Sequence, residues 1–207
     1  MKIYTKQEIP QRSEMWFRIR ANKMTASNAD RILANGNGLK TYCYELVTEF
    51  LSENIPEQLQ NENILRGVML EEQAAIYCSM LTNMDWQEIG FVEVNDYTGC
   101  SPDRVIMENG KITKILEIKC PNDKNFLELL LSEEIPSKYV AQMQFQMMCC
   151  ETPSCIYFAY NTNIYPYYFM REIKADKDMQ SRLQIGLNRG RELIKNLMKE
   201  YQAKVGE

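Results

Sequence analysis

The chain has 207 residues, a length that fits a single domain over residues 1–207 with room for a helical extension. Apolar residues make up 45%, enough for a packed core, and this composition argues against a disordered chain. No apolar run approaches the roughly 20 residues of a membrane span, and the N-terminus has no hydrophobic signal region. We therefore expect a protein of the cytoplasm without membrane contact.

The residue types present limit the kinds of catalytic, metal-binding and nucleic-acid-binding site that the chain can have. The sequence contains no histidine, which excludes Ser-His-Asp and Cys-His catalysis and histidine metal sites. Its seven cysteines form no CxxC pair, so we expect reduced, mostly buried thiols rather than a metal or disulfide framework. The net charge of −4 argues against nucleic-acid binding, although a local basic track can exist on an acidic molecule.

The first 82 residues are expected to be largely helical. Helices are predicted at residues 11–22, 25–34, 41–53 and 62–82. Thr25 or Ser27 is the expected N-cap of the second helix, and the NGNG segment at 35–38 predicts a loop. The acidic segment 53–62 matches no motif that indicates a role.

Strands dominate the rest of the chain and alternate with helices. Strands are predicted at residues 89–94, 100–107, 111–120, 154–161 and 165–173, and helices at 126–131, 137–150 and 176–204. The aromatic side chains at 165–169 could stack on nucleobases, but a strand with one buried face is the favoured interpretation. This order of elements indicates an α/β (α+β) fold with a central mixed β-sheet flanked by helices.

Two of these strands meet at Asn109-Gly110, a strong hairpin signal. The first strand carries Asp103, and the second carries Glu117 and Lys119, which share one face because side chains alternate along a strand. A two-residue loop would turn Asp103 to the opposite face. A three-residue loop ending at Gly110, or a bulge of equal parity, would place all three side chains together.

The apolar pattern selects between these registers. With the three-residue loop, Ile106, Ile112, Leu116 and Ile118 share the other face and can face a core. Because a slip of one residue reverses the facing of every side chain, this pattern favours the loop Glu108-Asn109-Gly110 or a bulge of equal parity.

Two carboxylates on one face repel each other unless a cation lies between them. Mg²⁺ is a hard ion that prefers oxygen ligands and commonly binds one or two carboxylates together with substrate phosphate oxygens. A nearby lysine can orient an attacking water or stabilise developing charge. Asp103, Glu117 and Lys119 therefore point to hydrolysis of a phosphodiester, although solvated strand residues with Lys119 in an ion pair would give the same isolated pattern.

Further blocks accompany this hairpin. They are Trp16-Phe-Arg-Ile-Arg20, Thr25-Ala-Ser27, Arg66-Gly-Val-Met-Leu-Glu71, Cys100-Ser-Pro-Asp103, Leu116-Glu-Ile-Lys-Cys-Pro121 and Tyr139-Val-Ala-Gln-Met-Gln144. In their order the sequence resembles the lambda exonuclease (YqaJ-type) viral recombinase family of the PD-(D/E)xK nuclease superfamily. The resemblance runs from about residue 14 to 150 and implies a restriction-endonuclease-like core.

The resemblance implies a metal site and a catalytic centre. The implied ligands of Mg²⁺, for which Mn²⁺ would substitute, are Asp103, Glu117, Glu71 and the backbone carbonyl of Ile118. Lys119 would position or activate the attacking water. Gln142 would lie beside the site and help to order water or substrate.

The resemblance also implies a substrate and partners. Arg20, Ser27 and Ser101 match positions that hold a 5′-terminal phosphate, which implies a processive 5′–3′ exonuclease acting on the ends of double-stranded DNA. Members of the family often form a toroidal homotrimer around duplex DNA and act with a single-strand annealing protein in recombination. The chain would then be phage- or prophage-encoded and work in the bacterial cytoplasm.

Two alternatives stay open. An endonuclease of the same superfamily, acting in restriction or repair, would carry the same site. A catalytically inactive DNA-binding module is the second, but retention of the complete Asp-Glu-Lys set argues against it. Arg104 departs from relatives, which often have glycine there, and it could contact a phosphate or only be exposed.

Overall fold

The structure is a computed structural model that describes residues 1–52 and 62–206. Its helices are α1 Glu14–Arg20, the 3-10 helix η1 Ala26–Asn28, α2 Ala29–Ala34, α3 Asn37–Ser52, α4 Glu62–Thr82, α5 Asp123–Ser132, α6 Ser137–Cys150 and α7 Lys177–Val205. Its strands are β1 Lys2–Thr5, β2 Met24–Thr25, β3 Ile89–Asn95, β4 Thr98–Cys100, β5 Arg104–Glu108, β6 Lys111–Lys119, β7 Ser154–Tyr160 and β8 Tyr168–Lys174. Most of the acidic segment 53–62 and the end of the helix predicted at 41–53 lie outside the described residues.

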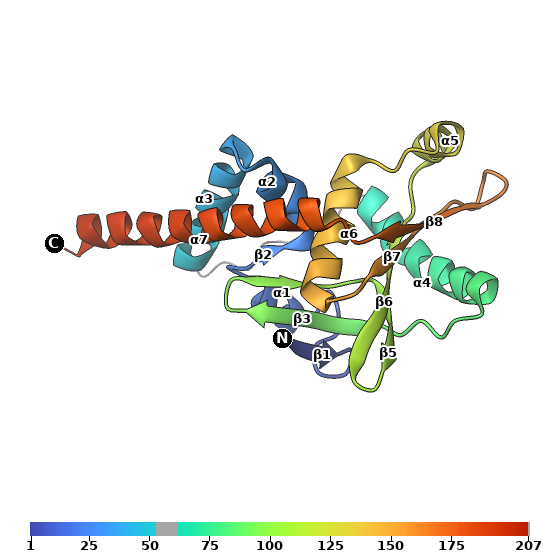
Figure 1. The fold of residues 1–207 in the computed structure, drawn as a ribbon, viewed down its shortest axis with the longest axis horizontal. Coiled ribbons are helices and arrows are strands. Elements are labelled where there is room, and N and C mark those ends of the chain that lie inside the picture. Colours follow the sequence, from blue (N-terminus) through green and yellow to red (C-terminus); the bar gives the residue numbers. More distant parts are fainter. Residues whose placement is uncertain (53–61, 207) are drawn as a thin grey trace.

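The strands form two four-stranded sheets (Figure 1). The first sheet has the order β1-β3-β4-β2 and the second the order β5-β6-β7-β8. In the second sheet β6 and β7 are parallel, while the two outer pairs are antiparallel. The predicted mixed sheet flanked by helices is therefore confirmed, with the strands divided between two sheets instead of gathered in one.

The strand predicted at 100–107 is divided between the two sheets. β4 ends at Cys100 in the first sheet, and β5 begins at Arg104 in the second. The segment 101–103 connects them, and its buried Pro102 has no N–H to donate to a strand ladder. The two sheets thus meet at the Ser-Pro-Asp block.

The loop between β5 and β6 differs from the predicted one. Glu108 pairs with Lys111, so the loop has two residues, and the prediction of three is wrong. Asn109 and Gly110 both have positive φ, 51° and 75°, as the tight hairpin turn of this length requires.

A bulge restores the predicted parity. Thr113 has no partner in the register, because the pairing of β5 with β6 shifts between Ile106 and Met107. Beyond this bulge Arg104 pairs with Leu116. Continuing that register by one residue places Asp103 opposite Glu117. The equal-parity alternative is therefore the one that the chain adopts.

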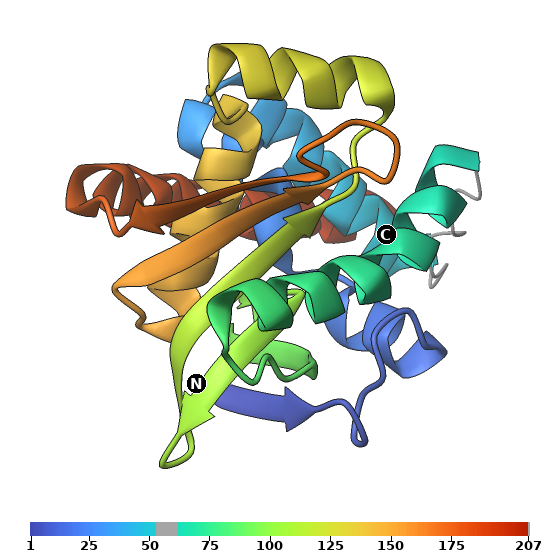
Figure 2. The ribbon, with the colours of Figure 1, turned by 90° about the vertical axis from the view of Figure 1, so that its right-hand side faces the viewer.

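Helices α4 and α6 cover the two faces of the second sheet (Figure 2). On the α4 side, the buried residues are Ala74, Ala75, Cys78, Trp86, Leu116, Ile118, Ile156 and Phe158. The predicted apolar face is confirmed for Ile106, Leu116 and Ile118. It is wrong for Ile112, which precedes the bulge and joins the larger core on the other side.

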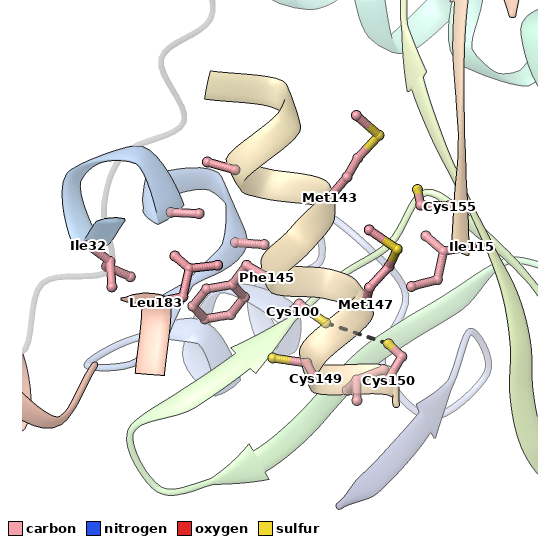
Figure 3. Packing of buried hydrophobic residues seen from close by; sticks show 14 of the residues in the cluster. Ile32, Cys100, Ile115, Met143, Phe145, Met147, Cys149, Cys150, Cys155 and Leu183 are labelled. Carbon is pink, nitrogen blue, oxygen red and sulfur yellow. Dashed lines mark hydrogen bonds between the residues drawn. The ribbon is translucent and has the colours of Figure 1, made fainter. Parts of the chain in front are cut away.

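Helix α6 runs through the larger core. Figure 3 shows Met143 and Met147 directed toward Ile115 and Cys155, while Phe145 points toward Leu183. The side of α6 that faces β6 is therefore fixed by packing. Six of the seven cysteines are buried and Cys120 is partly so, which confirms that most of them lie in the interior.

The other predicted elements differ mainly at their ends. The helix predicted at 25–34 begins only at Ala29, after a short strand and a 3-10 turn, and neither Thr25 nor Ser27 caps it. The loop predicted at 35–38 is shorter, because α3 begins at Asn37. The strand predicted at 165–173 begins at Tyr168, so that the first aromatic residues lie in the preceding loop.

Helix α7 packs against the body through its first half and extends beyond it (Figure 1). Leu183 and Leu187 are buried, whereas Tyr201 is 43% exposed. Gly186 permits a close approach, since a Cβ there would lie 2.3 Å from the carbonyl oxygen of Ile32. Within the described ranges, no helix combines the length and the apolar character needed to cross a membrane.

Candidate active site

Glu117 lies at the centre of the candidate active site and is fully buried on β6. Its Oε1 accepts hydrogen bonds from Nζ of Lys119 and from Nε2 of Gln142, the latter at 2.6 Å. Its Oε2 accepts a hydrogen bond from Nε2 of Gln146 at 2.7 Å. Because a buried charge is costly without such donors, these three side chains stabilise the carboxylate and set its orientation.

Asp103 lies beside Glu117, directly before β5. Its Oδ2 accepts a hydrogen bond of 2.6 Å from the backbone N–H of Ile118. Burial raises the pKa of Asp103 well above its usual value, and the charges of Glu117 and Glu71 raise it further. Lys119 and the Ile118 N–H act in the opposite direction. The predicted acids Asp103, Glu117 and Glu71 are thus close enough to repel one another.

Lys119 is the cation of this cluster. Burial lowers the pKa of Lys119, but the negative charges of Glu117 and Asp103 outweigh this effect, so that its pKa is raised above the usual value. Its Nζ lies 5.0 Å from the centre of the Tyr139 ring as well as against Glu117. Lys119 is therefore positively charged at neutral pH and suited to stabilise negative charge on a substrate.

Glu71 reaches the cluster from α4 and is held by two arginines. Its carboxylate pairs with Arg12 and, at 3.7 Å, with Nη1 of Arg104. Arg104 also pairs with Glu72 and donates a hydrogen bond of 2.8 Å to the carbonyl oxygen of Asp103. Since Arg104 is only 5% exposed, it is neither a solvated side chain nor free to contact a phosphate. It supports Glu71 and the Asp103 backbone instead.

Gln146 is a site residue that the sequence reasoning did not assign. It is fully buried on α6, and its Nε2 is the donor to Glu117 Oε2. Gln146 follows Gln142 by four residues, so both amides project from one side of the helix. That spacing is visible in the sequence, but it fits a polar helix edge equally well. Only the packing of α6 on β6 shows that both amides meet Glu117.

A second cluster lines a cavity of about 370 Å³ beside α1, η1 and α3. The guanidinium of Arg20 lies 4.1 Å above the Trp16 ring, and its Nη2 is 3.4 Å from Oγ of Ser27. Burial lowers the pKa of Arg20. Across residues 1–52 and 62–206, Arg20 has no carboxylate in salt-bridge distance, so its charge is available to an anion.

Ser101 joins the two clusters. Its Oγ accepts a hydrogen bond of 2.8 Å from Nε1 of Trp16 and donates one of 3.1 Å to the carbonyl oxygen of Gly90. Arg20 and Ser101 therefore both contact the indole ring of Trp16, and Ser27 contacts Arg20. Asp103 follows Ser101 by two residues, so this short segment connects the carboxylate cluster to Trp16, which lines the cavity.

The residues of the carboxylate cluster fit a hard divalent cation. The donors are carboxylate oxygens of Asp103 and Glu117, the ligand type that Mg²⁺ and Mn²⁺ prefer. The mutual repulsion that raises the pKa of Asp103 is the electrostatic condition that a cation relieves. As the side chains are placed, the described part of the chain has no group of three or more acidic or cysteine residues arranged around one ion position. Glu71 would have to turn from Arg12 to join the ligands.

Comparison with solved structures supports the fold. LHK-Exo in complex with dAMP matches with a TM-score of 0.85 at 24% identity, covering 94% of this chain and 98% of that one. The alkaline exonuclease LHK-Exo from Laribacter hongkongensis matches with a TM-score of 0.79 at 25% identity, covering 93% and 100%. A phage-related exonuclease from Haemophilus somnus gives 0.68 at 13% identity, covering 89% and 99%.

Comparison of the sequence itself gives a family but no individual relative. No curated protein matches it. The profile of the YqaJ-like viral recombinase domain matches residues 15–153, which is more than half of the chain and includes both clusters described above. The chain therefore belongs to the YqaJ-like viral recombinase family.

Proposed function

We propose that the chain is a metal-dependent deoxyribonuclease that degrades linear double-stranded DNA from its 5′ ends. The observation that carries the proposal is the segment 101–103, which links a cluster of carboxylates and Lys119 to a cavity with an arginine that has no carboxylate partner among the described residues. Such an arrangement suits an enzyme that holds a terminal phosphate and cuts beside it. Family membership and the likeness to alkaline exonuclease support the same conclusion.

The proposed roles come from the resemblance to the family, and the contacts of Asp103, Glu117 and Lys119 support them. Asp103, Glu117, Glu71 and the Ile118 carbonyl would hold the ion, with Mg²⁺ as the natural choice and Mn²⁺ as a substitute. A bound divalent ion supplies polarisation of the scissile phosphate and a lowered pKa of the attacking water.

The other side chains act around that ion. Lys119 donates toward the attacking water and stabilises the developing charge. Gln142, already within hydrogen-bond distance of Glu117, orders water or substrate beside it. Arg20, Ser27 and Ser101 bind the 5′-terminal phosphate, which gives the enzyme its polarity.

The test uses linear duplexes labelled at one 5′ or one 3′ end, incubated with Mg²⁺ or with chelator. We expect early release of the 5′ label, no degradation with chelator, and an intact closed circular duplex. Cleavage of the closed circle would instead indicate an endonuclease of the same superfamily, acting in restriction or repair. Absence of cleavage on every substrate would indicate an inactive DNA-binding module.

Lys119→Ala separates catalysis from binding. The variant should bind linear duplex as the wild type does but cleave it at least about 100-fold more slowly, since removal of one group that stabilises a transition state costs about that much. Normal cleavage by this variant would contradict the mechanism.

The biological setting is proposed from the family. A toroidal homotrimer around duplex DNA would keep the enzyme on its substrate, and a single-strand annealing protein would take up the strand that resection exposes. The setting would be recombination in the bacterial cytoplasm, with a phage or prophage as the source of the gene. Light scattering of the purified chain tests the trimer.

A further inference from the structure

The loop between β7 and β8 carries two aromatic side chains that the core does not use. Tyr165 is 80% exposed and Tyr167 is 42% exposed, whereas Tyr168 and Phe169 pack on the sheet and the core. The two exposed rings lie 5.7 Å apart at 88° to each other. In this edge-to-face arrangement each ring can cover at most one face of the other, and Tyr165 in particular stays largely open.

The loop is built to hold these rings in place. Asn161 at its base is fully buried, and its Oδ1 accepts hydrogen bonds from the N–H groups of Asn163 and Ile164 at 2.8 and 3.0 Å. The N–H of Asn161 donates to the Tyr167 carbonyl at 2.8 Å, which closes the loop. A loop closed in this way presents its tip at little entropic cost to a ligand.

The same loop is tied to the active site. Nδ2 of Asn161 donates to the carbonyl of Pro121 at 3.2 Å and to Asp123 at 2.9 Å. Pro121 follows Lys119 by two residues, and Lys119 pairs with Ala159 across the parallel strands β6 and β7. The aromatic loop therefore begins beside the end of β6 that carries the catalytic lysine. Figure 2 shows this loop between α5 and α4, above the ends of the strands.

A cation lies at the base of the loop. Nη1 of Arg66, on α4, is 3.4 Å from the same Pro121 carbonyl that Asn161 contacts. Arg66 has no salt bridge to any carboxylate of the described residues. Arg66 and the loop that carries the exposed rings thus meet at one carbonyl. Proteins bind unpaired nucleic-acid strands with such a combination, since the cation meets phosphate and the rings stack on bases.

We propose that Tyr165 and Tyr167, with Arg66, form a stacking site for nucleobases of an unpaired DNA strand at the active site. This inference rests on the proposed function, since it assumes that DNA reaches Lys119. The ligand is a nucleobase together with its phosphate. This base can belong to the strand that is degraded or to the complementary strand that remains, and the experiment distinguishes these two sources.

The experiment measures binding to duplexes whose last base pairs are mismatched, in the presence of chelator so that nothing is cut. 2-Aminopurine is placed in the unpaired bases of either the 5′-ended or the 3′-ended strand. Tyr165→Ala and Tyr167→Ala should each weaken binding to the frayed duplex by about tenfold or more, the effect expected for one lost base stack. Tyr165→Phe should bind as the wild type does, because it keeps the ring. The strand whose 2-aminopurine fluorescence is quenched by the wild type and not by the alanine variants is the one that stacks.

Tyr201→Ala is the matched control, because Tyr201 is 43% exposed but lies near the far end of α7. Equal affinities of Tyr165→Ala, Tyr167→Ala and Tyr201→Ala for the frayed duplex would overturn the stacking site. So would 2-aminopurine that is quenched in neither strand by the wild type. If the wild type cleaves DNA while the loop variants bind normally, the stacking site fails and the nuclease proposal stands. If no DNA is cleaved but the loop variants lose affinity for frayed ends, the stacking site stands and the nuclease proposal fails.

Discussion

Gln146→Met should separate metal affinity from stability. The substitution keeps the approximate shape of the side chain but removes the 2.7 Å hydrogen bond to Glu117 Oε2. A hydrogen bond to a charged group contributes about 1.5–3 kcal/mol. The same change also removes Gln146 Oε1, a buried oxygen without a hydrogen-bond partner in the described structure, which costs the wild type about 1–3 kcal/mol. The two effects oppose each other, so the free energy of unfolding should change by no more than about 2 kcal/mol.

The expected effect on the proposed metal site has no such compensation. Loss of a side chain that orients a metal ligand typically costs about 10- to 100-fold in metal affinity or activity. We therefore expect the Mn²⁺ concentration for half-maximal binding, measured by calorimetry, to rise by about that factor in Gln146→Met. The concentration for half-maximal cleavage should rise with it.

Gln144→Met is the matched control, two residues away on the same helix. Gln144 is buried, but it donates to the Lys174 carbonyl and accepts from the Asp176 N–H, both at 2.8 Å, without contacting Glu117. This variant should lose about 1–3 kcal/mol of stability, since two part-buried hydrogen bonds of about 0.5–1.5 kcal/mol each are lost, while its Mn²⁺ affinity stays normal. An unchanged Mn²⁺ affinity in Gln146→Met, or an equal loss in both variants, would refute the reasoning.

Three further predictions concern other contacts. Arg20→Ala should reduce the preference for 5′-phosphorylated over 5′-hydroxyl ends by about tenfold or more, because a charged hydrogen bond to the phosphate is lost; equal degradation of both ends by the wild type would contradict the assignment. Gly186→Ala should lower the free energy of unfolding by about 1–3 kcal/mol in urea titration, because its Cβ would lie 2.3 Å from the Ile32 carbonyl. Gly67→Ala, with no described atom within 4 Å of its Cβ, should be neutral or slightly stabilising. Arg104→Met should lower the free energy of unfolding by about 2–4 kcal/mol, less than the loss of a fully buried ion pair because Glu72 is exposed. A melting temperature equal to that of the wild type would show that Arg104 does not hold these acids together.

The sequence predicts the long elements well because many apolar positions repeat within them. The helix predicted at 62–82 matches α4, and the one predicted at 137–150 matches α6. In the first sheet only β3, predicted at 89–94, is found as expected. The strands β1, β2 and β4 escape prediction, since they have only four, two and three residues. Strands that short are defined by their partners in space and contain too few residues for alternation to be seen.

The candidate site is also only partly predictable from the sequence. The shared face of Asp103 and Glu117 follows from the parity of the hairpin, which the apolar residues of β6 report. The sequence does not show where the extra residue of the hairpin lies. An extra residue in the turn and one at Thr113 leave Asp103 and Glu117 on the same face in either case. The partners of Arg104 and Gln146 depend on how α4 and α6 pack against the sheet, and no local pattern contains that information.

The segment 101–103 has a consequence for the size of the product. Ser101 is held by Trp16 and Gly90, and Asp103 is held by the Ile118 N–H, so both ends of this segment are fixed. Two residues of extended chain span about 7 Å, a length comparable to one nucleotide of DNA backbone. If Ser101 holds the terminal phosphate and Asp103 lies at the bond that is cut, the polypeptide itself sets the length of each released fragment. Inserting one residue after Ser101 would break the hydrogen bonds at one end of the segment, so we expect such a variant to release fragments of less uniform length.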